Sequence, residues 1–130
     1  MYLLDTSALL THCFSEAGAD EVDAILASKT AYVAAVTWFE LRVKLQGTTH
    51  ASVLLQLYAD TLAGTVDITP EVAEAAFRLR QTVGVRIPAV DSLIAGAAIA
   101  RGFHLVHRDS HLAAIPLSVL SQIVLPVKSQ

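Results

Sequence analysis

Short apolar runs separated by helix-forming stretches dominate this sequence. Each run has three to five residues, and a segment with helical spacing of apolar positions lies between one run and the next. This alternation predicts βα units, and therefore an α/β domain with a parallel sheet. The strands that we expect are Tyr2–Leu4, Ala31–Ala35, Thr65–Ile68, Leu105–His107 and Ile123–Leu125.

Capping residues and glycines predict where the helices begin and end. Thr6 or Ser7 is expected to cap a first helix that runs to about Phe14, and Thr69 to cap one that Pro70 opens. The other expected helices are Ala19–Ser28, Thr37–Gln46 before Gly47, Ser52–Leu62, and one that Pro88 opens and that ends at Gly102. The stretch Ala89–Ala100 is apolar almost all round, which predicts a buried helix whose small residues pack closely against the sheet.

The composition is that of a folded domain without a membrane span. A chain of 130 residues is long enough for one domain with a core. Hydrophobic residues make up 54% and charged residues 16%, which excludes disorder and predicts some apolar surface for a partner. No apolar run reaches the length of a membrane span, and Asp5 interrupts the apolar N-terminus where a signal peptide would continue. With Cys13 as the single cysteine, we expect a cytoplasmic protein with no membrane association.

Charge is distributed unevenly along the chain. Residues 1–77 contain ten acids and three bases, whereas residues 78–130 contain two acids and six bases. The net charge of −3 argues against a nucleic-acid binder, but the basic half could face a polyanion. The arginines concerned are Arg78, Arg80, Arg86, Arg101 and Arg108. The alternative is that they are scattered surface charges.

Four acids, Asp5, Glu40, Asp91 and Asp109, lie in or beside apolar runs. A buried lone carboxylate is unfavourable, so such acids neutralise, pair or bind a cation. Asp5 and Asp109 follow expected strands, and the other two lie near helix starts, so all four are expected at the carboxyl edge of a parallel sheet. Converging carboxylates predict a hard divalent metal, and a metal held by acids indicates phosphoryl chemistry.

Each acid also has a purely structural explanation. Asp5 and Asp109 can cap the helices that follow them. Asp91, in a first helical turn, favours the helix dipole. Glu40 can pair with Lys44, four residues further on.

Four motifs resemble the PIN-domain family, and within it the VapC-type toxins of bacterial toxin–antitoxin pairs. In chain order they are Leu4–Leu10 (LDTSALL), Thr37–Leu41 (TWFEL), Asp91–Ala98 (DSLIAGAA) and Leu105–Leu112 (LVHRDSHL). Together they span almost the whole chain. His107 departs from the common form, which has Thr or Ser there.

The resemblance implies a three-layer α/β/α fold with a central, mainly parallel sheet of four to five strands. It implies an endoribonuclease that depends on Mg²⁺ or Mn²⁺ and, as a toxin, inhibits translation by cutting RNA, often transfer RNA. The metal would be held by Asp5, Asp91 and Asp109, with Glu40 direct or through water. A cognate antitoxin and a homodimer are also implied.

Three further residues are expected to position the substrate in such a site. Ser7, two residues after Asp5, could hold a water or a phosphate oxygen. His107, two residues before Asp109, could position RNA or the attacking water. Arg108 could contact RNA, although a solvated surface charge is the simpler interpretation.

Two other classes of protein would also gather acids at this edge. A receiver-type signalling module would need a lysine after a late strand, and Lys128 is the only candidate. A non-catalytic protein-binding domain would keep the acids for the fold alone. An Asp-x-Asp phosphatase is excluded because Ser7 replaces the second acid.

Overall fold

The sheet has five parallel strands in the order β3-β2-β1-β4-β5. This computed structural model describes residues 1–127; Lys128, the lysine that a receiver-type module would need, lies outside them. The strands are β1 (Tyr2–Leu4), β2 (Ala31–Ala34), β3 (Gly64–Val66), β4 (His104–His107) and β5 (Gln122–Val124). The predicted α/β class and parallel sheet are therefore confirmed.

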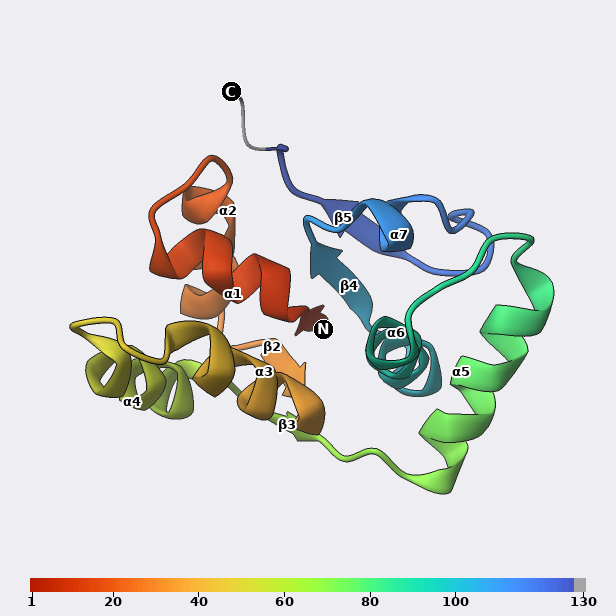
Figure 1. The fold of residues 1–130 in the computed structure, drawn as a ribbon, viewed down its shortest axis with the longest axis horizontal. Helices are drawn as coiled ribbons and strands as arrows, with labels where there is room; N and C mark the ends of the chain where they lie inside the picture. The colour runs from red at the N-terminus through yellow and green to blue at the C-terminus, as the bar shows by residue number, and fades with distance from the viewer. Residues whose placement is uncertain (128–130) are drawn as a thin grey trace.

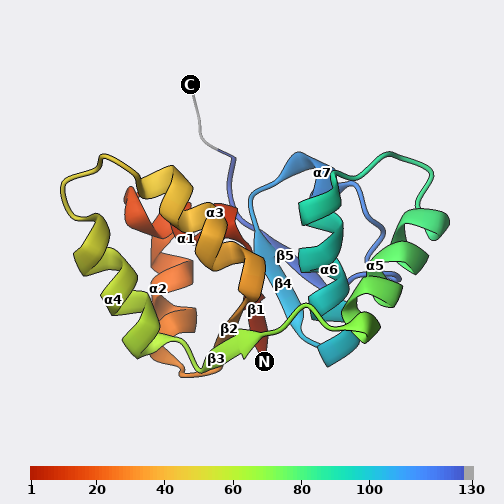
Figure 2. The same ribbon diagram turned by 60° about the horizontal axis from the view of Figure 1, so that its bottom comes forward.

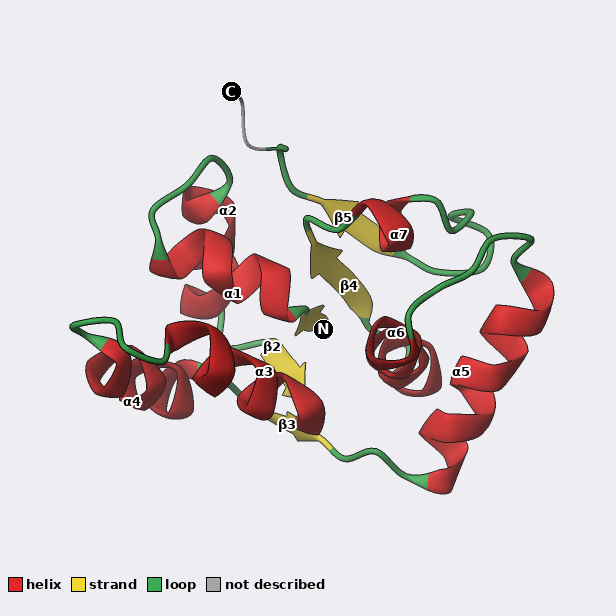
Figure 3. Ribbon diagram, viewed as in Figure 1, coloured by secondary structure: helices red, strands yellow, loops and turns green. Residues whose placement is uncertain are grey.

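Helices cover both faces of this sheet and complete the predicted three layers (Figures 1 and 3). They are α1 (Thr6–Cys13), α2 (Ala19–Ala27), α3 (Ala35–Leu45), α4 (Ala51–Thr61), α5 (Pro70–Thr82), α6 (Ala89–Arg101) and α7 (Ser110–Ala113). Helices α1 to α4 lie on one side of the sheet, and α5, α6 and α7 lie on the other (Figure 1). Within residues 1–127, none of these helices combines the length and apolar character that spanning a membrane requires.

Alternation of side chains along the strands produces the two cores. Leu3 and its partner Leu105 point into the core beneath α5 and α6. Leu4 and its partner Val106, one residue further on, point into the core beneath α1 to α4. Because both faces are covered, the strands are continuous apolar runs rather than alternating ones, which is why they were recognisable in the sequence.

Two local predictions were wrong. Asp5, not Thr6 or Ser7, is the N-cap of α1, since its side chain accepts a hydrogen bond from the Ser7 backbone N–H. Helix α3 begins at Ala35, directly after β2, rather than at Thr37. The short side chains of α6 allow close approach to α5 as well as the sheet, because a Cβ on Gly96 would lie 2.8 Å from backbone atoms of α5.

The path of the chain creates a switch in direction beside β1. From β1 the chain adds β2 and then β3 on one side, and after α5 and α6 it returns to pair β4 with the other side of β1. Ligands of open α/β sheets bind at the carboxyl ends of the strands at such a point. The start of α6 and the short helix α7 lie near each other at this edge (Figure 2).

Candidate active site

Asp5 lies at the end of the central strand and is almost fully buried. Its side chain is 4% exposed. One carboxylate oxygen, Oδ2, accepts hydrogen bonds from the Ser7 backbone N–H at 3.1 Å and from Ser7 Oγ at 2.5 Å. Ser7 Oγ in turn accepts a hydrogen bond from the Arg108 backbone N–H at 2.9 Å, which ties the end of β1 to the loop after β4. Ser7 therefore fixes the orientation of Asp5.

Burial raises the pKa of Asp5 above its ordinary value. The hydrogen bonds from Ser7 and the nearby His107 oppose this rise, and the charge of Asp109 adds to it. Burial thus disfavours the charged form of this carboxylate, a cost that a bound cation would offset.

Glu40 is held by α1 rather than by its own helix. The Thr6 hydroxyl donates to Glu40 Oε1 at 2.6 Å, and the same oxygen of Thr6 lies 3.3 Å from the buried Thr37 hydroxyl. Across residues 1–127, Glu40 forms no ion pair with Lys44, which is exposed. The structural explanation of a helical Glu–Lys pair is therefore wrong, and Glu40 is directed toward the start of α1.

Asp91 shares one electrostatic environment with the other three acids. Its pKa rises to about 6, first because of burial and then because of the charges of Asp109, Asp5 and Glu40; His111 opposes the rise. Carboxylates influence one another in this way only when they lie close together. The charges of the four acids therefore act on one another, and among residues 1–127 the group with ligand atoms within 4.8 Å of one another is Asp91, Asp109 and His111.

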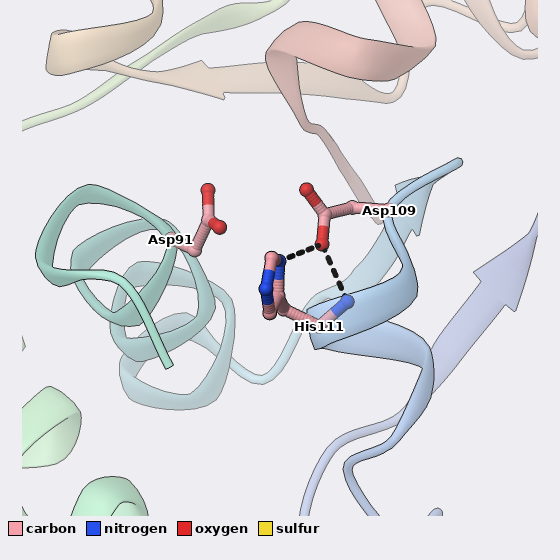
Figure 4. Close-up of side chains that lie close together, drawn as sticks. All are labelled: Asp91, Asp109 and His111. Carbon is pink, nitrogen blue, oxygen red and sulfur yellow. Dashed lines mark hydrogen bonds and ion pairs between the residues drawn. The ribbon is translucent and has the colours of Figure 1, made fainter. Parts of the chain in front are cut away.

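Asp109 caps α7, and its neighbour His111 joins the acid cluster. Asp109 Oδ1 accepts hydrogen bonds from the backbone N–H groups of His111 at 2.7 Å and Leu112 at 3.2 Å. One ligand atom from each of Asp91, Asp109 and His111 lies within 4.8 Å of the others. Figure 4 shows the imidazole ring between the two carboxylates. His111 was missed in the sequence, although the Asp-x-His spacing at a helix start was visible there.

His107 is buried at the end of β4 and has no exposed surface. Its Nδ1 accepts a hydrogen bond from the Asp109 backbone N–H at 3.0 Å, and Nε2 lies 2.7 Å from Gln122 Oε1. Gln122 Nε2 donates to the Ile115 carbonyl at 2.7 Å, so the side-chain oxygen of Gln122 faces the His107 ring. The proton of the His107 ring is therefore assigned to its Nε2. Direct contact of His107 with RNA or water is not available in this structure; instead the ring holds the backbone of Asp109.

Arg108 is also not a free surface charge. Its Nη2 lies 2.8 Å from Glu16 Oε1, and both side chains are 17% exposed. Its Nη1 is buried and has no hydrogen-bond partner within the part of the chain that is described. The alternative of a solvated surface charge is therefore wrong, whereas the predicted contact of Arg108 with RNA stays a prediction.

The remaining arginines do not form one continuous basic surface. Arg78 pairs with Glu74 at 3.0 Å along α5. Arg101 lies 5.1 Å from the centre of the Phe103 ring, at the amino edge of the sheet and away from the acids. Arg80 and Arg86 are exposed, and Arg86, in the loop before α6, is on the same edge as Asp91.

The donor set fits a hard divalent cation. All four acids offer carboxylate oxygens, which Mg²⁺ and Mn²⁺ prefer. No lysine or arginine among residues 1–127 pairs with any of them, and burial raises the pKa values of Asp5 and Asp91. Asp91 and Asp109, together with His111, bring ligand atoms within 4.8 Å of one another, and the charges of Asp5 and Glu40 act on Asp91.

The sequence model of the PIN domain matches residues 2–117. The chain belongs to the PIN-domain family. Comparison with curated protein sequences finds no significant match.

Several solved structures, VapBC complexes among them, have the same fold as this PIN domain. VapBC2 from Rickettsia felis, described as bound to a DNA fragment from their promoter, superposes with a TM-score of 0.78 at 19% identity, over 96% of this chain and 98% of that chain. VapBC-5 from Mycobacterium tuberculosis, a member of the VapBC family of toxin–antitoxin systems, gives 0.69 at 24% identity, over 96% and 97%. FitAcB from Neisseria gonorrhoeae gives 0.62 at 26% identity, over 88% and 93%. The predicted resemblance to PIN domains of VapC type is confirmed at the level of family and fold.

Proposed function

We propose that this PIN domain is a metal-dependent endoribonuclease that acts as the toxin of a toxin–antitoxin pair. The observation that supports this most directly is the convergence of four carboxyl groups, which no lysine or arginine of residues 1–127 neutralises, at the switch point of the sheet. The family and the VapC-type fold agree with the proposal.

In the proposed reaction, water adds to the phosphorus of an RNA phosphodiester and the bond to one ribose oxygen breaks. Asp5, Asp91 and Asp109 would hold Mg²⁺ or Mn²⁺, and Glu40 would do so directly or through water. The bound ion supplies Lewis acidity and charge neutralisation for hydrolysis.

The surrounding residues of the chain have positioning roles in this proposal. Ser7 donates a hydrogen bond to Asp5 Oδ2 and leaves Oδ1 for the ion. Thr6 donates to Glu40 Oε1 and leaves Oε2 for the ion or its water. The backbone N–H groups at the start of α7 orient the Asp109 carboxylate. His107 Nδ1 holds the backbone of Asp109 by accepting a hydrogen bond from its N–H. Because the acids are held on the ends of packed elements, little reorganisation is needed when the ion and substrate bind.

Incubation of the purified chain with total RNA tests the activity. The parent is expected to cut RNA with Mg²⁺ or Mn²⁺ and to be inactive with a chelator, and mapping the cut ends gives the target, which we expect to include transfer RNA. Asp5→Asn and Asp91→Asn should lower cleavage by at least a hundredfold, whereas the matched variant Asp67→Asn, on an exposed acid after β3, should cut like the parent. Parental cleavage by either site variant would refute the mechanism.

We further propose that a cognate antitoxin and a second copy of the chain cover its apolar surface. Helices α3 and α4 expose large hydrophobic side chains, among them Phe39 at 72% and Val53 at 66%. A cleft of about 500 Å³ between these helices, lined by Trp38, Arg42 and Leu55, could receive an amphipathic helix. Toxicity on expression, relieved by co-expression of the neighbouring reading frame, is the expected result; a chain that is soluble and harmless alone would contradict it.

A further inference from the structure

His111 is the one histidine that lies among the proposed metal ligands with no hydrogen bond to its ring within residues 1–127. The rings of His12, His104 and His107 each form hydrogen bonds with other residues of the chain. The His111 ring atom Nδ1 lies 3.4 Å from Asp109 Oδ1. Charge-assisted hydrogen bonds are usually about 2.7–2.9 Å long, so this contact leaves the ring available.

The start of α7 brings this ring to the acid pair. The His111 backbone N–H donates to Asp109 Oδ1 at 2.7 Å, which fixes where the side chain leaves the helix. The ring is 55% exposed and lies between Asp91 and Asp109 (Figure 4). Ligand atoms of the three residues are within 4.8 Å of one another. Two donors bound to one ion lie at most about 4.2 Å apart, so a side-chain movement of under about 1 Å would complete the group.

On the basis of the proposed function, we propose that His111 supplies a nitrogen ligand to the metal site, beside Asp91 and Asp109, and makes it select Mn²⁺ over Mg²⁺. Mg²⁺ binds oxygen almost exclusively and keeps its waters, whereas imidazole favours first-row transition ions. A site made only of carboxylates would gain less affinity when Mn²⁺ replaces Mg²⁺. The mixed site therefore differs from an oxygen-only site in which ion it prefers, not only in how tightly it binds.

Metal binding by the purified full chain tests this without reference to activity. Calorimetric titration with Mn²⁺ and with Mg²⁺ is compared for the parent, His111→Gln, which keeps an oxygen donor of similar reach, and His50→Gln, an exposed histidine before α4. Mn²⁺ affinity should fall at least about tenfold in His111→Gln, because loss of a group that only supports a metal ligand already costs about 10–100-fold in affinity. Mg²⁺ affinity should change by less than about threefold, and His50→Gln should match the parent.

Pulsed electron paramagnetic resonance of the Mn²⁺ complex provides a second readout. The parent and His50→Gln should show coupling to a directly bound ¹⁴N nucleus, and His111→Gln should lack it. Mn²⁺ bound without nitrogen coupling, or with equal affinity in His111→Gln, would overturn the role of His111 while RNA cleavage that depends on Asp91 still upheld the proposed function. A parent chain that binds neither ion and cuts no RNA would overturn both.

Discussion

Replacement of Asp91 by asparagine should stabilise the metal-free protein while it abolishes the activity. The pKa of Asp91 is raised from 3.8 to about 6 by burial and by three neighbouring carboxylates. That difference corresponds to an upper bound of roughly 3 kcal/mol. Solvent screening of the partly exposed group lowers it to about 2 kcal/mol, and loss of the favourable helix dipole removes about 0.3–1 kcal/mol. A net gain of about 1 kcal/mol remains.

The gain should depend on pH in a defined direction. Because the folded state favours the protonated carboxyl, the destabilisation in the parent is absent below pH 3.8, grows as the pH rises toward 6, and is complete above that. Asparagine has no such titration. The melting temperature of Asp91→Asn in chelator should thus exceed that of the parent by about 3–4 °C at pH 8 and converge with it near pH 4.

Metal should reverse this order. A divalent ion at a hundred times its dissociation constant stabilises the parent by about 2.7 kcal/mol, or about 10 °C in a domain of this size. Asp91→Asn should lose most of that shift, and Asp67→Asn should behave like the parent throughout. Thermal unfolding with chelator, Mg²⁺ or Mn²⁺ at several pH values measures all of these. A variant less stable than the parent in chelator at pH 8, or one with the full metal shift, would refute the reasoning.

Three further substitutions test the packing of α6 against α5 and the hydrogen bonds that hold Glu40 and His107. Gly96→Ala should lower the free energy of unfolding by about 1–3 kcal/mol, because the new Cβ would lie 2.8 Å from backbone atoms of α5; unchanged urea unfolding would contradict this close packing. Thr6→Val should lower cleavage about tenfold with a smaller effect on stability, because it removes the 2.6 Å hydrogen bond to Glu40, and an unaltered rate would exclude this role. Gln122→Leu should destabilise the fold by about 1–3 kcal/mol, since it leaves the buried Nε2–H of His107 without an acceptor, and parental stability would show that the ring finds another partner.

The elements of the fold were predictable because each depends on a local pattern. Strands buried on both faces are uninterrupted apolar runs, as in Tyr2–Leu4. Thr69 and Pro70 specify the start of α5, where the Thr69 side chain accepts from the Val72 backbone N–H at 3.2 Å. The strand order required the tertiary structure, because no local pattern determines on which side of β1 the chain returns.

The convergence of the acids was predictable for a different reason. In a parallel sheet the connectivity alone places every residue that follows a strand at one edge, so Asp5 and Asp109 had to meet once β1 and β4 were neighbours. The capping role of each was treated as an alternative to a metal role. The structure shows that the two are compatible, since Asp5 Oδ2 and Asp109 Oδ1 accept from helix N–H groups and each carboxylate keeps a second oxygen.

The roles of His107, Arg108 and His111 could not be read from the sequence, because each depends on a partner remote in the chain or on the direction of a side chain. His107 resembled a site residue by its place two positions before Asp109, yet a hydrogen bond to Gln122 fixes its buried ring in the interior. The ring of His111, two positions after Asp109, is 55% exposed and lies beside the Asp109 carboxylate (Figure 4). Residues 107–111 thus contain a buried imidazole, which accepts a hydrogen bond from the Asp109 backbone, and an exposed imidazole beside the Asp109 carboxylate, for which we propose the role of metal donor. Asp109, the N-cap of α7, lies between the two histidines in the chain.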